Sequence, residues 1–168
     1  TFFPEIPFAN GTQHMHLLPG VSELVCSLAR KYGIGALRVP RRIIRTPGRQ
    51  ARTFFTKVMG WLGRRTAQAL DGSGILCTDA FAGFDMSGAV TADRVLGLLD
   101  NLPGGSCELM VHPGLDCPAL REGLPWGYHD FNWAGERAAM MDPAVRKRVD
   151  TLGVGLIRFR DLQHGPEH

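Results

Sequence analysis

Two histidines, His14 and His16, are the first residues in this sequence whose type and spacing could support chemistry. In a β-strand, residues i and i+2 project from the same face, so a strand here would direct both imidazoles into one cavity, beside Asn10 and Thr12. Imidazole is the commonest metal ligand and a frequent general acid or base near neutral pH. The pattern therefore predicts a metal or catalytic site. The alternative is a chance pair of histidines in a turn, with Asn10 and Thr12 as ordinary turn residues.

Three further polar residues stand at or near the ends of predicted strands. Arg38 lies in the short apolar strand 36–39, which Pro40 ends, and Asp79 closes a predicted strand over 74–79. A third strand, 107–111, leads directly into His112, which is followed by Pro113 and Gly114. Functional sites of parallel α/β folds lie at the carboxyl ends of strands. We therefore expect Arg38, Asp79 and His112 to gather near the two histidines.

Helical segments that alternate with these strands would position the residues and indicate an α/β fold with mostly parallel strands. Gly33 is a natural end for the first helix, Thr91 is a cap, and Asp142-Pro143 is a typical helix start. A Pro-, Gly- and aromatic-rich loop over 115–133 is long enough to be a lid or a binding loop. The predicted helices cover 22–32, 49–70 (with breaks near Gly60 and Gly63 as an option), 92–99, 134–141 and a segment from 143 to 153, and a last strand covers 154–159.

Composition places the chain among ordinary globular proteins. Its 168 residues are enough for one domain with a core. Of these residues 44% are hydrophobic and 21% are charged, which is ordinary for a globular protein. No run of about 18 apolar residues and no signal peptide is visible, so we expect a cytoplasmic protein. The start at Thr1 lacks an initiator Met, which suggests a fragment or a processed product. The four cysteines form no Cys-x-x-Cys pair, and we expect reduced core thiols.

The net charge of +3 is unevenly distributed. Between Leu24 and Leu70 the sequence contains no Asp or Glu but eleven Lys and Arg residues, from Arg30 to Arg65. Such a block creates a positive field that could attract phosphates, anionic lipid or nucleic acid. A solvated basic face without a specific anion site is the simpler interpretation.

Residues 10–20 are Asn-Gly-Thr-Gln-His-Met-His-Leu-Leu-Pro-Gly, residues 38–40 are Arg-Val-Pro, and residues 108–114 are Glu-Leu-Met-Val-His-Pro-Gly. These motifs resemble those of the YdjC-like carbohydrate deacetylases, a family that includes chitooligosaccharide deacetylases and hopanoid-biosynthesis-associated proteins. The first resembles the family motif Asp/Asn-Gly-His-Gln-His-x-His-x-x-Pro, and the second resembles its Val-Arg-x-Pro strand. Residues 108–114 are similar to its Glu-Leu-Met-x-His-Pro-Gly signature. Glu136-Arg137 and the segment 149–162 are similar to its closing helix and ending. The resemblance spans nearly the whole chain in the family's order.

The resemblance implies an α/β fold of the NodB-like deformed (β/α) barrel type, here incomplete at the N-terminus, with one domain over 1–162 and a tail over 163–168. It implies a hydrolase that removes acetyl groups from N-acetylated sugars or from a glycolipid, such as a hopanoid-related one. A divalent metal, Zn²⁺ or Mg²⁺, would polarise the acetamide carbonyl and activate water. The roles that it implies are catalytic for His112 and Arg38, substrate-binding for Asn10 and Arg137, and metal-binding for His14, His16 and Thr12.

The sequence departs from the family pattern in two respects. The Asp-Asp motif and the first metal-binding His of the family are not in this chain, and Thr12 replaces the first His of the His-x-His-x-His run. A catalytic zinc usually needs three protein ligands. Two functions therefore stay open: a deacetylase, and a non-catalytic remnant or binding module with a basic anion- or membrane-binding face. The expected partners are the sugar or glycolipid, an anionic membrane surface and a second copy of the chain; a nucleic acid is not expected.

Overall fold

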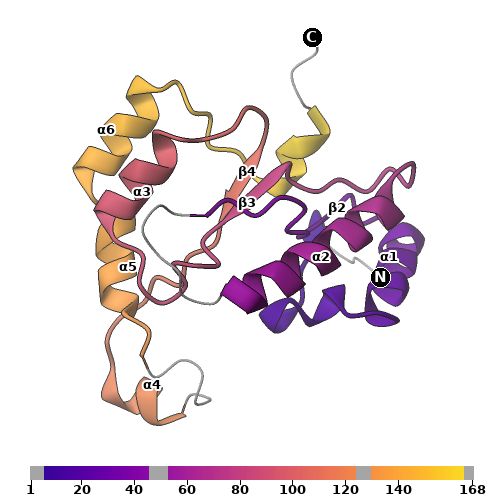
Figure 1. Ribbon diagram of the computed structural model, residues 1–168, viewed down its shortest axis with the longest axis horizontal. Coiled ribbons are helices and arrows are strands. Elements are labelled where there is room, and N and C mark those ends of the chain that lie inside the picture. Colours follow the sequence, from indigo (N-terminus) through magenta and orange to yellow (C-terminus); the bar gives the residue numbers. More distant parts are fainter. Residues whose placement is uncertain (1–5, 46–52, 124–129, 165–168) are drawn as a thin grey trace.

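The computed structural model describes residues 6–45, 53–123 and 130–164. Strands and helices alternate along most of the chain, as the sequence predicts (Figure 1). The elements are β1 (Phe8–Ala9), η1 (Thr12–Leu17), α1 (Val21–Tyr32), β2 (Ala36–Leu37), α2 (Thr53–Leu70), β3 (Ala80–Ala82), α3 (Ala92–Leu99), β4 (Cys107–Leu109), α4 (Pro118–Gly123), α5 (Trp133–Met140), α6 (Pro143–Thr151) and η3 (Phe159–His164).

The strands are parallel and follow one another in sequence order. β1 pairs with β2, and β3 pairs with β4 with Phe81 opposite Glu108. Isolated bridges from Ala36 to Leu76 and from Ile43 to Phe81 join the two pairs. The chain thus has the α/β class with parallel strands that the sequence predicts, and the carboxyl ends of all four strands meet at one edge.

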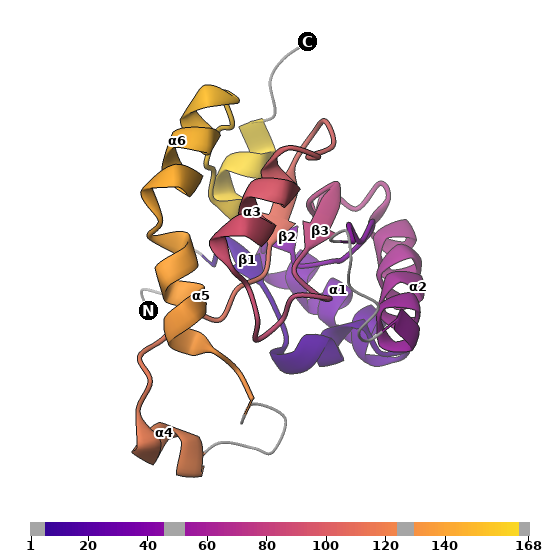
Figure 2. The same cartoon turned by 60° about the vertical axis from the view of Figure 1, so that its left-hand side comes forward.

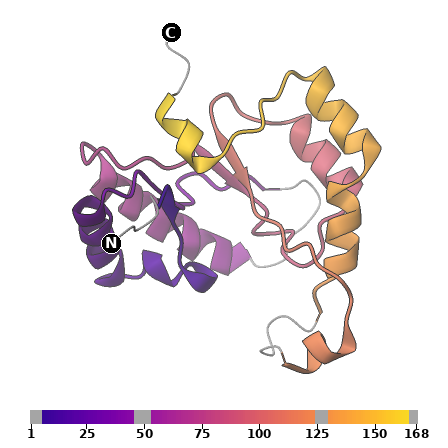
Figure 3. The same cartoon turned by 180° about the vertical axis from the view of Figure 1, so that it is seen from behind.

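Two clusters of buried side chains hold the helices against the strands. The first includes Leu37, Leu62 and Phe81 and joins α1 and α2 to the strands, and the second includes Val95 and Val145 and joins α3, α5 and α6 to β4. Figures 1 and 2 show these two helical groups on opposite sides of the strands, and Figure 3 shows α4 projecting beyond α5. None of the helices in the described ranges is both long enough and apolar enough to cross a bilayer.

Local sequence signals set the helix ends. Gly33 ends α1 with a left-handed φ of 67°, and the Thr91 side chain caps α3 by accepting a hydrogen bond from the Arg94 N–H. The Asp142 side chain caps α6, and Pro143 is its first residue. These predictions are confirmed. α2 continues through Gly60 and Gly63 without a break; residues 49–52 of the predicted helix lie outside the described ranges.

Two predicted strands are wrong. The ladder expected over 74–79 forms instead at Ala80–Ala82, and Leu76 makes only the isolated bridge to Ala36. Residues 154–158 form no strand because no described segment pairs with them, and Leu156 is 73% exposed. The predicted loop over 115–133 contains the helix α4, and its residues 124–129 lie outside the described ranges.

Candidate active site

The segment with the two histidines is a tight turn and not the predicted strand. Residues 12–17 form the 3₁₀ helix η1, in which Gln13 and His14 have left-handed φ values of 51° and 58°. Gly11 makes this turn possible: a Cβ there would lie 2.7 Å from Nδ1 of His16. The turn still brings the two imidazoles together, with their ring centroids 6.0 Å apart.

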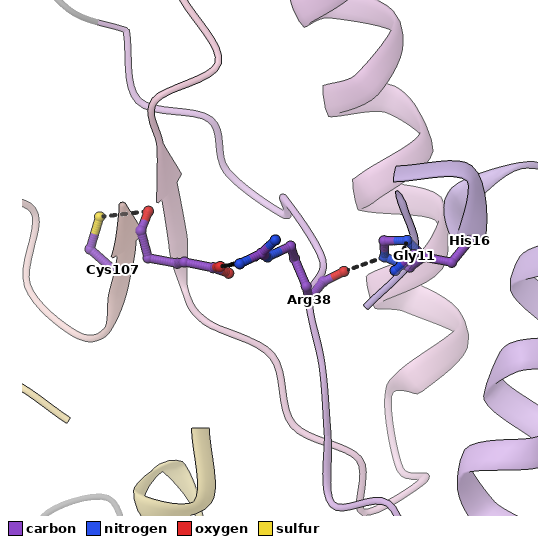
Figure 4. A network of polar contacts seen from close by, with 5 residues as sticks. Gly11, His16, Arg38 and Cys107 are labelled. Carbon is purple, nitrogen blue, oxygen red and sulfur yellow. Dashed lines mark hydrogen bonds and ion pairs between the residues drawn. The ribbon is translucent and has the colours of Figure 1, made fainter. Parts of the chain in front are cut away.

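His16 is a structural residue of this turn. The Gly11 N–H donates to its Nδ1 at 3.0 Å, and its Nε2 lies 2.6 Å from the Arg38 carbonyl oxygen (Figure 4). Because Nδ1 accepts, Nε2 carries the proton and donates to that carbonyl. Both ring nitrogens are therefore engaged with backbone, and His16 ties η1 to the end of β2. Burial lowers the pKa of His16, against the effect of these hydrogen bonds.

His14 is also buried, but unlike His16 it has a ring nitrogen that makes no hydrogen bond among the described residues. Its ring packs against Phe84 and Phe81, with centroid distances of 4.8 and 5.6 Å. Its Nδ1 is buried and has no hydrogen-bond partner among the described residues. Burial, followed by the proximity of His16, Arg38 and His112, lowers the pKa of His14 to about 4. At neutral pH the imidazole is therefore uncharged and offers a lone pair to a ligand.

Arg38 and Glu108 form an ion pair across β3. The Nε and Nη2 atoms of Arg38 both lie 2.5 Å from Oε1 of Glu108. The other carboxylate oxygen, Oε2, is buried and has no hydrogen-bond partner in the described part of the chain. Burial raises the pKa of the Glu108 carboxyl, and Arg38 opposes this effect. The pair thus presents an acceptor oxygen that a hydroxyl, an amide N–H or a water could satisfy.

His112 follows β4 at the same edge and contacts a buried carboxylate. Its backbone N–H donates to Oε2 of Glu136 at 2.5 Å, and its Nδ1 lies 3.8 Å from that oxygen. Its ring packs edge-on against Phe131, with centroids 5.0 Å apart. The imidazole is 30% exposed, so a ligand at this edge could reach it.

The structure brings some of the predicted residues together and leaves others apart. His14, His16, Arg38 and His112 lie at the carboxyl ends of β1, β2 and β4, whereas Asn10 and Thr12 are exposed on the turn and Arg137 is exposed on α5. The roles assigned to all seven residues stay predictions.

The expectation for Asp79 is wrong. Asp79 precedes β3, so it lies at the amino ends of the strands, where its carboxylate accepts from the Ser106 N–H and hydroxyl. These bonds lower the pKa of Asp79 and join the starts of β3 and β4.

The residues present do not fit a metal site of three protein ligands. No group of three His, Cys, Asp or Glu side chains that could hold a metal gathers within residues 6–45, 53–123 and 130–164. His16 uses both ring nitrogens on backbone groups, and Thr12 is exposed. His14 is the predicted metal-binding residue whose Nδ1 is free to bind.

Reasoning from the sequence alone missed two carboxylates. Glu108 pairs with a residue 70 positions away and Glu136 with a backbone group 24 positions away. Glu108 alternates with the apolar residues of its strand and precedes His112 by four residues, which was the available signal. Glu136 carries no such signal, because the sequence of an amphipathic helix does not distinguish a buried acidic residue from an exposed one.

Residues 4–151 match the family model described as YdjC-like protein. A carbohydrate deacetylase of Mus musculus is 31% identical over 176 aligned positions, which cover 91% of this chain and 54% of that protein. A carbohydrate deacetylase of Homo sapiens is 31% identical over 176 positions, which cover 92% of this chain and 52% of that protein. The chain thus spans about half the length of the curated relatives it matches. No solved structure matches it significantly.

Proposed function

Because the chain belongs to the YdjC-like family, we propose that it forms one wall of the active site of a carbohydrate deacetylase. The observation that carries this proposal is the meeting of His14, the Arg38–Glu108 pair and His112 at one edge of parallel strands. The names of the mouse and human relatives support a sugar as the substrate. The consecutive order of the parallel strands supports a NodB-like (β/α) barrel, of which these strands are part.

The proposed reaction adds water across the amide bond of an N-acetylated sugar. The water oxygen bonds to the acetyl carbon, the C–N bond breaks, and acetate and a free amine leave. The attacking water loses a proton and the amine nitrogen gains one. The exposed imidazole of His112 is placed to donate to the amine, and the proton released from the water restores it. Glu108 Oε2 can accept a hydrogen bond from the sugar or the attacking water, and Arg38 adds positive charge beside the developing oxyanion.

We further propose that this chain alone does not hold the divalent metal expected from the family. When bound, such an ion polarises the carbonyl and activates water. The described residues do not supply three ligands for it, and His14 is the side chain here that suits one coordination position.

The first test is an NMR titration with N,N′-diacetylchitobiose beside the same disaccharide without its acetyl groups. We expect the signals of His14, Arg38 and residues 108–112 to shift with the acetylated sugar, and Glu108→Gln to weaken the shifts severalfold. The matched control is Glu122→Gln, because Glu122 is exposed on α4. Shifts elsewhere, or no shift, would overturn the proposal.

Calorimetric zinc titration and acetate release then separate an enzyme from a binding module. We expect no saturable zinc site in the wild type and a measurable one in Thr12→His, where the family's missing imidazole is restored. Acetate release from N-acetylglucosaminides would assign catalysis to this chain. Sugar binding without release would assign it the role of a non-catalytic binding module.

A second candidate function, attachment to an anionic membrane that carries a glycolipid, is favoured by the surface of α2. Phe54 is 81% exposed and Trp61 55% exposed, and Val58 lies on the same helix face. The neighbouring Lys57 and Arg64 are exposed too. Exposed aromatic residues beside basic ones are typical of helices that bind lipid surfaces. A hopanoid-related glycolipid is one substrate that such a surface would suit.

Vesicle co-sedimentation tests this attachment. We expect binding to vesicles with phosphatidylglycerol, not to phosphatidylcholine alone, with a loss at high salt. Trp61→Ser should weaken binding, whereas Leu156→Ser, at a residue equally apolar and 73% exposed, should not. Equal binding to both vesicle types would rule out this function.

A further inference from the structure

We propose that Glu136, a fully buried carboxylate on α5, is a positioning residue that fixes the backbone and the imidazole of His112. It deepens the proposed function, since His112 is the proton donor there. Its support is the contacts of Glu136 with the loops that follow β3 and β4, the second of which carries His112.

Both oxygens of the Glu136 carboxyl group accept a backbone hydrogen bond. Oε1 accepts from the Val90 N–H at 3.3 Å, and Oε2 accepts from the His112 N–H at 2.5 Å. The side chain is 0% exposed, so solvent cannot replace either bond. A glutamine has one carbonyl oxygen and one donor NH₂ group, and it cannot accept from both N–H groups.

The same carboxylate faces the side chain of His112. Oε2 lies 3.8 Å from Nδ1 of the ring, and Phe131 packs against the ring at 66°. The ring is therefore confined between an anion and an aromatic edge. This placement favours a proton on Nδ1, toward Glu136, and stabilises the imidazolium from which Nε2 would donate its proton to the amine.

Other contacts hold the same segments together and should preserve the fold without Glu136. The Asn132 N–H donates to the Gly88 carbonyl at 2.9 Å, and the Gly114 N–H donates to the Trp133 carbonyl at 3.1 Å. Phe131 also fills the space beside Gly88, where a Cβ would lie 2.4 Å from its ring. These contacts join the loops after β3 and β4 to the start of α5.

The test is the state of the His112 ring in the wild type and in Glu136→Gln, with Glu122→Gln as the exposed control. Long-range ¹H–¹⁵N spectra, assigned with His112→Gln, should place the proton of wild-type His112 on Nδ1. We expect the His112 ring signals to change in Glu136→Gln and to stay unchanged in Glu122→Gln. A wild-type ring with a bare Nδ1, or unchanged ring signals in folded Glu136→Gln, would overturn the proposal.

Kinetics give a second readout that a merely structural role would not produce. In Glu136→Gln we expect kcat for acetate release to fall about 10- to 100-fold, the usual cost of removing a carboxylate that orients a histidine. KM should change little, and Glu136→Asp should recover part of the rate. If the wild type releases no acetate, catalysis by this chain is refuted and the binding module remains, whereas the spectra still decide the role of Glu136.

Discussion

His14 should make the stability of this protein depend on pH between neutrality and pH 4. Its pKa falls from 6.5 to about 4 on folding, mainly because the imidazole is buried. A difference of this size corresponds to about 3 kcal/mol of unfolding free energy. This is a large fraction of the 5–15 kcal/mol that stabilises a typical domain.

The sign follows from which state binds the proton. Above pH 6.5 the imidazole is neutral in both states, and His14 adds no pH dependence. Between pH 6.5 and about 4 the unfolded chain binds a proton that the folded chain does not, so the free energy of unfolding falls as the pH falls. Below pH 4 both states are protonated, and the loss is complete.

Urea unfolding at a series of pH values, for the wild type and His14→Asn, measures this contribution. Asparagine does not titrate in this range and tolerates the left-handed φ of 58° at this position. His16 remains in both proteins, so the difference between the two curves isolates His14. We expect the wild type to lose about 3 kcal/mol more than the variant between pH 7 and pH 4.

Parallel stability curves would refute this reasoning. They would mean that the pKa of His14 is the same in the folded and the unfolded chain, so that burial does not disfavour its charged form. The imidazole would then be protonated below about pH 6.5, and a charged imidazole has no lone pair for a ligand.

Three other predictions follow from single contacts. Gly63→Ala should destabilise the protein by about 1–3 kcal/mol in urea unfolding, because its Cβ would lie 2.3 Å from the Pro40 carbonyl oxygen. The control is Gly97→Ala, whose Cβ would lie in open space on α3, and it should be neutral or stabilising by up to ~1 kcal/mol. Glu108→Ala should cost about 1–3 kcal/mol by leaving Arg38 half-buried without its partner, and adding Arg38→Met should recover part of this loss. A chelator should leave the urea midpoint unchanged, because no described group of three ligands could hold a metal; a lowered midpoint would contradict this.

The helices could be predicted from the sequence because their signals are local. Gly33, Thr91 and Asp142-Pro143 act within one turn of the helix end they define, and all three do so in the structure. The strands could not be placed as well. A strand of two or three residues exists only where a neighbour pairs with it, so the ladder formed at 80–82 and not at 74–79.

The candidate site was predictable in outline for a topological reason. Parallel strands place their carboxyl ends at one edge, so His14, Arg38 and His112 meet whatever the details of the turns. The partners of these residues were not predictable. Glu108 and Glu136 act on residues distant in sequence, and no local pattern distinguishes a buried carboxylate from an exposed one.

The two histidines of the opening motif show that spacing alone does not assign chemistry. As residues i and i+2 of a strand they would be equivalent, but in a 3₁₀ turn they face different surroundings. His16 donates to and accepts from backbone, which fixes the turn to β2, and this leaves no ring nitrogen for a ligand. His14 has aromatic neighbours and an Nδ1 without a hydrogen bond among the described residues, so it can still bind a ligand, as the motif predicts. A His16 substitution should therefore disturb the position of His14 and Arg38, whereas a His14 substitution should remove a binding group and leave the turn in place.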